Sequence, residues 1–417
     1  MRVLVLTTSF PRWQGDLFGS FVFGLARAQR NASLQVVVLA PQDRNASASE
    51  ILDGVQIKRF QYFLPSRWQN LCYGAGIPAN IRQQPLRLIQ LPLLIGAFIK
   101  AGAAQARECD LIHAHWTFAG MAAEWLGRRY HKPVVLSVYG AELYPRRAGS
   151  LSAPIIQRAG HVICISSYTA ERVKQLAAPR NLSIIPYGIN PDILRAETNR
   201  DNGAARDSAS TRTDRNALCQ RLGIKSDVCI ISFLGRLVAR KGVDDLIRAV
   251  ALLIERGEKV HLAIGGSGPQ RGEWEILARA LGVEQRVTFL GTLPGSELPA
   301  FYAGSDIFVL PAIVDASGDT EALGLVLLEA MANRVPTVAT KVGGIADIVI
   351  DGETGLLVEQ RNPAQLADAL TRLCRSPELR NALGIAAQRR VETHFSWDAI
   401  AARTQMVYDQ VIASRVS

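Results

Sequence analysis

The sequence predicts an α/β protein made of two doubly wound Rossmann-like domains. Its 417 residues exceed what one hydrophobic core normally supports, so two domains are the default expectation. Both halves of the chain open in the same way, with an apolar strand, a glycine-containing loop and a helix. In the first half these are residues 3–9 and 21–30, and in the second half residues 228–234 and 243–256. Strands that alternate with helices indicate parallel sheets, one in each half.

Further apolar runs predict the remaining strands and the domain limits. We expect strands at residues 35–40, 111–114, 133–138, 162–165 and 182–185, and in the second half at 261–265, 287–290, 307–310 and 337–339. Residues 197–215 contain no large apolar side chain, which predicts a linker or surface insertion. The expected divisions are a first domain over 1–190, a linker or insertion over 191–220, a second domain over 221–395 and a terminal helix over 396–417.

Composition excludes several classes of protein. A hydrophobic content of 48% is too high for a mainly disordered chain. The longest apolar stretch, residues 86–99, is interrupted by Arg87, Gln90 and Pro92, and it is shorter than the roughly 20 residues of a membrane span, so we do not expect a transmembrane helix. The six cysteines are scattered without a C-x-x-C pair, which favours reduced thiols in a cytoplasmic protein and no structural zinc.

The positive charge is concentrated in the first half of the chain. The net charge is +10, and residues 1–196 hold 22 Lys/Arg against 10 Asp/Glu, whereas the remainder holds 25 against 27. Basic pairs at 58–59, 128–129 and 146–147 favour an anionic partner, such as an anionic membrane surface. No basic repeat or aromatic-interleaved motif supports nucleic acid as that partner. A basic surface that serves solubility alone remains an alternative.

Two carboxylates eight residues apart flank an apolar run in the second half. Glu321 precedes a helix that is expected to begin near Gly324, and Glu329 lies about one and a half turns into it. Both side chains would then face one ligand near a helix N-terminus, where free N–H groups favour a phosphate. The alternative is a solvated loop glutamate and a helix glutamate paired with a nearby Arg or Lys.

A second group of candidates follows the strand at residues 228–234. The loop from Gly235 to Gly242 contains Arg236, Arg240 and Lys241, which would meet an anion at the carboxyl end of a strand. Arg240 is equally compatible with a surface charge. No two aspartates have the D-x-D spacing of metal-dependent transferases, and Gly266 belongs to no complete dinucleotide fingerprint, which argues against an NAD enzyme.

The segment from Glu321 to Glu329, followed by 343–345 and 351–358, resembles the glutamate-x7-glutamate pattern of family 4 retaining glycosyltransferases (glycosyl transferases group 1). The resemblance spans nearly the whole chain and is strongest over residues 230–360. It implies the GT-B fold, in which two Rossmann-like domains face each other across a cleft. The first domain would bind the acceptor and the second the nucleotide sugar, and the terminal helix would return to the first domain.

The resemblance also implies roles for particular residues. Arg236 and Lys241 would bind the donor diphosphate, Glu321 the hydroxyls of the transferred sugar, and Glu329 the ribose. Backbone groups near the donor would come from Gly15, Gly235, Gly266, Leu323, Gly324, Leu325 and Val326. Tyr139 occupies the position where the family commonly has a histidine, and a tyrosine is not a base at neutral pH. His113 and His115 end a neighbouring strand, and hydrogen-bonded structural histidines are the alternative to a role at the site.

The implied activity is metal-independent, retaining transfer of a sugar from a nucleotide-diphosphate sugar to a glycan or lipid-linked acceptor. It needs no cofactor besides that donor, and it fits polysaccharide, lipopolysaccharide or glycolipid synthesis. We expect a cytoplasmic protein, peripheral on the inner face of the membrane. Two alternatives stay open, namely a non-catalytic nucleotide-sugar-binding subunit and a sugar phosphorylase or epimerase of the same fold.

Overall fold

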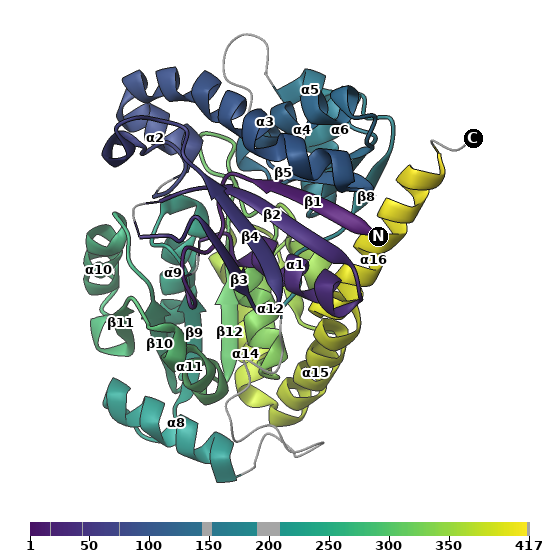
Figure 1. The fold of residues 1–417 in the computed structure, drawn as a ribbon. Coiled ribbons are helices and arrows are strands. Elements are labelled where there is room, and N and C mark those ends of the chain that lie inside the picture. Colours follow the sequence, from purple (N-terminus) through teal and green to yellow (C-terminus); the bar gives the residue numbers. More distant parts are fainter. Residues whose placement is uncertain (17, 44, 75, 144–151, 190–208, 415–417) are drawn as a thin grey trace. The chain divides into compact units, whose positions relative to one another are not determined.

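The computed structural model describes residues 1–417 except 17, 44, 75, 144–151, 190–208 and 415–417 (Figure 1). The basic pair at 146–147 and most of the predicted linker lie outside the described residues. The chain forms two compact units, one made of Met1–Gly188 with Trp397–Ser417 and the other of Ile189–Ser396.

The first unit contains a mostly parallel sheet whose strands lie in the order β3-β4-β2-β1-β5-β6-β7-β8. Only the pairing of β3 with β4 is antiparallel. Its strands are β1 (Arg2–Thr7), β2 (Gln35–Pro41), β3 (Ser49–Leu52), β4 (Val55–Phe60), β5 (Leu111–His115), β6 (Val134–Val138), β7 (His161–Cys164) and β8 (Leu182–Ile184). Its helices are α1 (Ser20–Asn31), α2 (Ile77–Gln83), α3 (Gln90–Glu108), α4 (Thr117–Arg129), α5 (Ser152–Arg158), α6 (Ser167–Leu176) and α16 (Trp397–Ala413).

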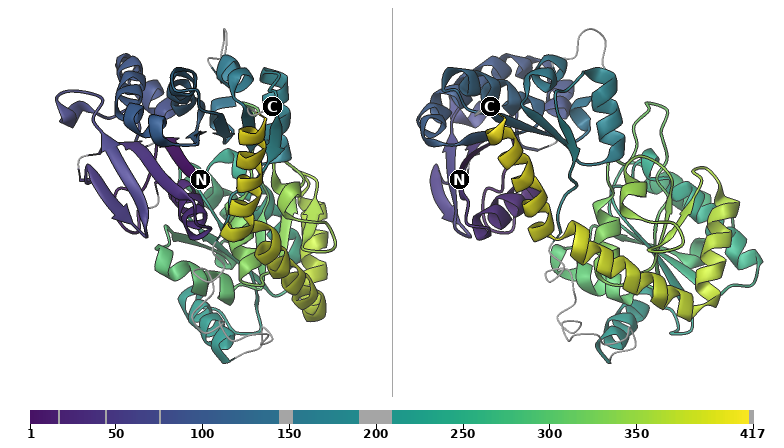
Figure 2. Two further views of the ribbon diagram at one scale, coloured as in Figure 1. Left: turned by 45° about the vertical axis from the view of Figure 1, so that its right-hand side comes forward. Right: turned by 90° about the vertical axis from the view of Figure 1, so that its right-hand side faces the viewer.

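Helices cover both faces of this sheet, and two hydrophobic clusters fill the spaces beneath them. One cluster joins the sheet to α3 and α4, with Leu94 and Phe98 completely buried. The other joins it to α1 and α16. Helix α16, yellow in Figure 2, packs against α1, and Tyr408 hydrogen-bonds Gln29 across that contact. The last helix therefore belongs to the core of the first unit.

The second unit contains a fully parallel sheet in the order β11-β10-β9-β12-β13-β14. Its strands are β9 (Cys229–Leu234), β10 (Val260–Gly265), β11 (Val287–Gly291), β12 (Ile307–Leu310), β13 (Thr337–Thr340) and β14 (Leu356–Val358). Its helices are α8 (Ala209–Leu222), α9 (Val243–Glu255), α10 (Arg271–Ala280), α11 (Leu298–Gly304), α12 (Leu325–Ala332), α13 (Ile345–Ile348), α14 (Pro363–Arg375) and α15 (Pro377–Arg390). This order is that of the Rossmann fold. The chain adds β10 and β11 on one side of β9, and it then crosses back to add β12, β13 and β14 on the other side.

The predicted fold class, two doubly wound α/β domains, is confirmed, but some predicted elements were wrong. The predicted linker extended too far, because residues from 209 onward form α8, whose Leu218 and Leu222 are buried. Strands β3, β4 and β14 were not predicted. The apolar stretch at 86–99 is part of a longer helical segment, Pro85–Glu108. By length and composition alone, this segment could cross a membrane.

Candidate functional site

The loops after β9 and β12 meet at the point where the strand order of the second sheet reverses. The loop after β9 runs from Gly235 to Gly242, and the loop after β12 runs from Pro311 to Gly324. Ile313 N donates to Arg240 O at 2.9 Å, and the Arg240 guanidinium donates to Thr320 O at 2.9 Å. Ligands of open α/β sheets bind outside the carboxyl ends of the strands at such a reversal. The sheet topology thus independently identifies these two loops as the candidate ligand-binding site.

Lys241 and Glu321, eighty residues apart in the sequence, form a salt bridge at this edge of the sheet. Both side chains are largely shielded from solvent. Arg236 lies on the same loop as Lys241 but is exposed, and no ion pair joins it to another residue that the structure describes. The structure therefore brings two of the predicted residues into direct contact and leaves the predicted second cation free to meet an anion.

Glu329 lies on α12 and accepts a hydrogen bond from the hydroxyl of Tyr302 at 2.6 Å. Burial raises the pKa of Glu329 above its usual range, although this hydrogen bond acts in the opposite direction. Tyr302 comes from α11, is completely buried and was not predicted. The alternative that paired the helix glutamate with an Arg or Lys is not what the structure shows.

The N-terminus of α12 lies directly after Glu321. Gly324 occupies the N-cap position with φ of 99°, and no side chain caps the helix. The first N–H groups of a helix have no partner within it, so those of Leu325 and Val326 are available to an acceptor. Both residues are only partly buried. Leu323 is buried and anchors the turn that leads into the helix.

Two glycines allow the loops of this edge to approach one another closely. A side chain on Gly266 would place its Cβ 1.8 Å from Gly235 O, and one on Gly343 would place it 1.8 Å from Glu321 O. Gly344 N also donates to Glu321 O at 3.0 Å. Any larger residue at Gly266 or Gly343 would force these loops apart. The absence of a side chain at these positions therefore permits the observed close contacts with Gly235 and Glu321.

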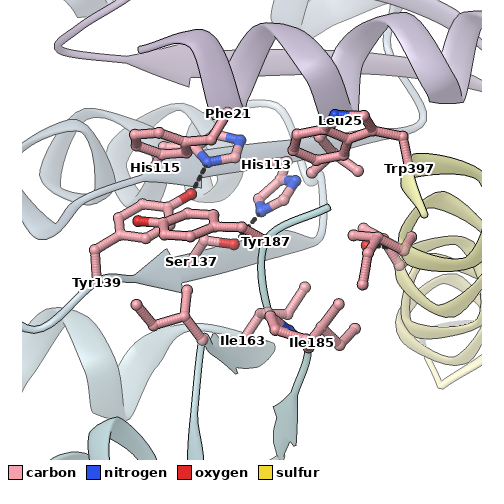
Figure 3. A pocket seen from close by; sticks show the side chains of 14 residues that line it. Phe21, Leu25, His113, His115, Ser137, Tyr139, Ile163, Ile185, Tyr187 and Trp397 are labelled. Atoms are coloured by element: carbon pink, nitrogen blue, oxygen red, sulfur yellow. Dashed lines mark hydrogen bonds between the residues drawn. The ribbon is translucent and has the colours of Figure 1, made fainter. Parts of the chain in front are cut away.

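The first unit has an aromatic pocket at the carboxyl ends of its central strands (Figure 3). Its lining includes Phe21, His115, Tyr139, Tyr187 and Trp397. Tyr139 stacks on Tyr187 with ring centroids 5.4 Å apart, and its hydroxyl is hydrogen-bonded to Nδ1 of His115. Burial raises the pKa of Tyr139 well above its usual value, so its hydroxyl stays protonated and is a hydrogen-bond donor rather than a base.

His113 is a structural histidine in this pocket. Its side chain is completely buried, with Nδ1 2.7 Å from the Tyr408 hydroxyl and Nε2 2.8 Å from the Ser137 hydroxyl. Burial lowers the pKa of His113 to about 3, so the imidazole is neutral. Burial and the neighbouring His113 lower the pKa of His115 well below its usual value.

Gly15 lies in the loop after β1, at the corresponding edge of the first sheet. It is exposed and has φ of 86°. The next residue, Asp16, accepts a hydrogen bond from Arg12 at 2.7 Å, and Arg12 also pairs with Asp43 at 2.8 Å. Although burial opposes it, the Arg12 contact lowers the pKa of Asp16. Arg12 was not predicted as part of this loop. The signal available in the sequence was a basic residue four positions before Asp16.

Among the residues that the structure describes, no group of three or more His, Cys, Asp or Glu side chains is arranged to hold a metal ion.

Two Rossmann-like units, each with candidate residues at the carboxyl edge of its sheet, are the architecture of GT-B glycosyltransferases. Residues 214–390 match the family model described as Glycosyl transferases group 1, and residues 19–193 match Glycosyltransferase Family 4. The chain is 31% identical over 350 residues to the D-inositol 3-phosphate glycosyltransferase of Corynebacterium jeikeium, covering 77% of this chain and 78% of the relative. The chain is therefore a glycosyltransferase, and it belongs to family 4.

A second relative and a solved structure match over almost the entire chain. The GDP-mannose-dependent alpha-(1-6)-phosphatidylinositol monomannoside mannosyltransferase of Mycobacterium tuberculosis is 29% identical over 411 residues, which is 96% of both chains. The structure of HepE from Anabaena in complex with UDP has a TM-score of 0.72 at 19% identity, covering 98% of this chain and all of HepE. The structural similarity supports the fold, and the sequence similarity supports the family.

Proposed function

We propose that this protein transfers a sugar, with retention and without a metal ion, from a nucleotide-diphosphate sugar to a glycan or lipid-linked acceptor. The observation on which this rests is the Lys241–Glu321 pair at the reversal point of the second sheet, with the exposed Arg236 on the same loop. The names of two similar proteins support the donor class, since one uses GDP-mannose and the other was solved with UDP.

The proposed donor fits the charges and hydrogen-bonding groups at this edge. Arg236 and the uncapped N-terminus of α12 would bind the diphosphate, because cations and free N–H groups both favour phosphate oxygens. Lys241, held in place by Glu321, would add a second positive charge as the diphosphate leaves. Glu321 would accept hydrogen bonds from the sugar hydroxyls and Glu329 from those of the ribose. Preorganised charge of this kind is usually the largest contribution of a protein to catalysis.

The experiment begins with the donor. A thermal-shift screen of UDP-, GDP- and ADP-sugars identifies the nucleotide, because a ligand at 100 times its Kd stabilises the folded state by about 2.7 kcal/mol. Turnover of that donor is then measured for wild type, Arg236→Ala and Lys241→Ala. Lys259→Ala is the matched control, because Lys259 is also paired with a carboxylate in the second unit, that of Asp227, but is exposed. We expect the first two variants to lower kcat/KM roughly a hundredfold.

The outcomes separate this proposal from its alternatives. Arg236 is exposed, so its replacement disturbs no packing, and wild-type turnover in both Arg236→Ala and Lys241→Ala would refute the proposed diphosphate contacts. EDTA should leave turnover unchanged, and NMR of the product should show retention at the anomeric carbon. Donor binding without any turnover would identify a non-catalytic subunit. Donor consumption without an acceptor sugar or lipid would favour a phosphorylase or epimerase.

We also propose that the first unit docks peripherally on an anionic membrane surface on the cytoplasmic side, where a lipid-linked acceptor would be available for polysaccharide, lipopolysaccharide or glycolipid synthesis. An exposed apolar patch supports this proposal, and its members are Leu64, Trp68, Leu86, Leu88, Ile89 and Leu93. Gln90 connects the two segments of the patch, since its amide donates to Trp68 O at 3.0 Å. Single exposed apolar side chains are ordinary, whereas six in one region are typical of an interaction surface.

The charge around this patch favours an anionic surface. Residues 54–107 contain seven Lys/Arg and no Asp or Glu, and of these cations Arg59 is buried and pairs with Glu50. Arg67, Arg82 and Lys100 are exposed there. Each cation near an anionic bilayer contributes about 1 kcal/mol. The inner face of α3 packs into the core through Leu94 and Phe98, so we propose that this segment lies on the bilayer rather than across it.

A further inference from the structure

Two cysteine side chains, far apart in the sequence, meet at the amino edge of the second sheet. Cys229 is the first residue of β9, and Cys374 lies near the end of α14. Their Sγ atoms are 3.3 Å apart, although 145 positions separate the residues. Both side chains are partly accessible, whereas Cys72, Cys109, Cys164 and Cys219 are buried. This pair therefore combines close contact with access for a small reagent.

The surroundings of the pair favour stepwise reaction of the two thiols. The hydrogen bond with Cys374, together with burial, raises the pKa of Cys229 well above its usual value. Cys229 therefore keeps its proton, and Cys374 is taken as the sulfur that reacts first. A disulfide needs the sulfurs about 2.0 Å apart, so they must approach by only about 1.3 Å from the observed 3.3 Å.

We propose that Cys229 and Cys374 are a redox-active pair that forms a reversible disulfide when the protein meets a low-molecular-weight disulfide. The Cys374 thiolate attacks the small disulfide, forms a mixed disulfide and releases one small thiolate. Once Cys374 is in the mixed disulfide, Cys229 gives its proton to the small thiolate just released, and its sulfur attacks the Cys374 sulfur, which releases the second small thiolate. The two protons of the protein thiols pass to the two released thiolates. The protein loses two electrons, and the small disulfide gains them.

The position of the pair predicts its effect. A disulfide here would join β9 to α14 and close a long loop of the second unit, which lowers the entropy of the unfolded chain. Strand β9 has six residues, so its amino end lies about 17 Å from its carboxyl end, where the loop with Lys241 begins. We therefore expect oxidation to raise thermal stability and to leave donor binding unchanged. Only that second expectation depends on the proposed function.

The test uses the full chain, reduced and then incubated with oxidised glutathione. We expect the number of free thiols to fall from six to four. Mass spectrometry of a non-reduced digest should find the peptides of Cys229 and Cys374 linked. The melting temperature of the second unit should rise by about 5–10 °C and return on reduction with dithiothreitol. Cys229→Ala and Cys374→Ala should each abolish the linked peptide and the rise. Cys219→Ala, in the same unit, is the matched control and should retain both.

Six thiols still free after oxidation would overturn the proposal, as would glutathione attached to either cysteine without a linked peptide. The peptide map of the wild-type protein decides the matter even if one alanine variant fails to fold. Loss of donor turnover in the reduced protein would bear on the proposed function alone and would leave this result unchanged.

Discussion

At the scale of single residues, His113 makes the stability of the first unit depend on pH. The folded pKa of His113 is about 3, against about 6.5 for a free histidine, because burial disfavours the charged form. A lowered pKa means that the unfolded state binds more protons. The stabilisation is therefore complete above pH 6.5 and is lost progressively as the pH falls from 6.5 toward 3.

We predict that the unfolding free energy falls as the pH is lowered below 6.5. Well below pH 6.5, each buried neutral histidine accounts for a loss of about 1.4 kcal/mol for every pH unit. Urea unfolding of the first unit at pH 7.0, 6.0 and 5.0 measures the slope. His113→Gln should reduce it by about that amount between pH 6.0 and 5.0. His131→Asn replaces an exposed histidine of the same unit and should leave the slope unchanged. An identical slope in wild type and His113→Gln would contradict a neutral His113.

The sequence could predict which residues gather at the site but not which atoms they contact. Glu321 and Lys241 were both recognisable from their neighbours along the chain. The hydrogen bond from Tyr302 to Glu329 was not, because a buried tyrosine in an apolar helix resembles any other core residue. The same holds for His113, whose partner Tyr408 lies 295 residues away. Side-chain partners depend on packing between distant segments, which local sequence patterns do not contain.

At the scale of elements, α8 forms where a linker or surface insertion was predicted, and the contacts of Arg215 attach it to the rest of the second unit. The Arg215 guanidinium pairs with Asp306, which precedes β12, and donates to Val228 O at 2.9 Å. Asp306 also accepts a hydrogen bond from Ile230 N at 2.7 Å. The polar composition of α8 predicted a linker because the helix contributes few apolar side chains. Its attachment depends on these contacts and on the buried Leu218 and Leu222.

We predict that Arg215→Ala lowers the unfolding free energy of the second unit by about 2 kcal/mol, since hydrogen bonds to charged groups contribute about 1.5–3 kcal/mol. Arg221→Ala is the matched control on the same helix. Arg221 pairs with Glu297 at 2.6 Å, but both side chains are more than 40% exposed, so the expected loss is under about 1 kcal/mol. Urea denaturation of both variants gives the comparison. Equal losses would show that Arg215 does not anchor α8.

The hairpin of β3 and β4 was not predicted, although the sequence contains a turn signal for it. Residues 55–58 alternate apolar and polar side chains directly after Asp53-Gly54, and both turn residues have positive φ, 46° and 79°. Asp-Gly next to alternating apolar residues is a strong signal for a tight hairpin. The short β14 carried no such signal, because three apolar residues after a glycine-rich turn also fit a loop.

At the scale of the whole molecule, the alternation of strands and helices was enough to predict the fold class. The order of the strands was not predictable from that pattern, and neither was the packing of α16 against α1, which joins the two ends of the chain in one core. These features depend on contacts between residues hundreds of positions apart. The two sheets nevertheless place their candidate residues at carboxyl edges, where the ligands of open α/β sheets bind.

The exposed apolar patch and its surrounding cations predict reversible binding of the whole protein to anionic bilayers. Burying one isoleucine side chain contributes about 1.5–3 kcal/mol, so Ile89→Asp should weaken vesicle affinity about tenfold or more. Ile276→Asp is the matched control, because Ile276 in the second unit is 60% exposed and Ile89 is 65% exposed.

Co-sedimentation with phosphatidylglycerol vesicles at low salt measures binding, and about 0.5 M NaCl should release the protein by screening its cations. Equal binding of both variants would show that the patch does not meet the bilayer. Equal binding to neutral phosphatidylcholine vesicles would show that the cations of residues 54–107 do not select the surface.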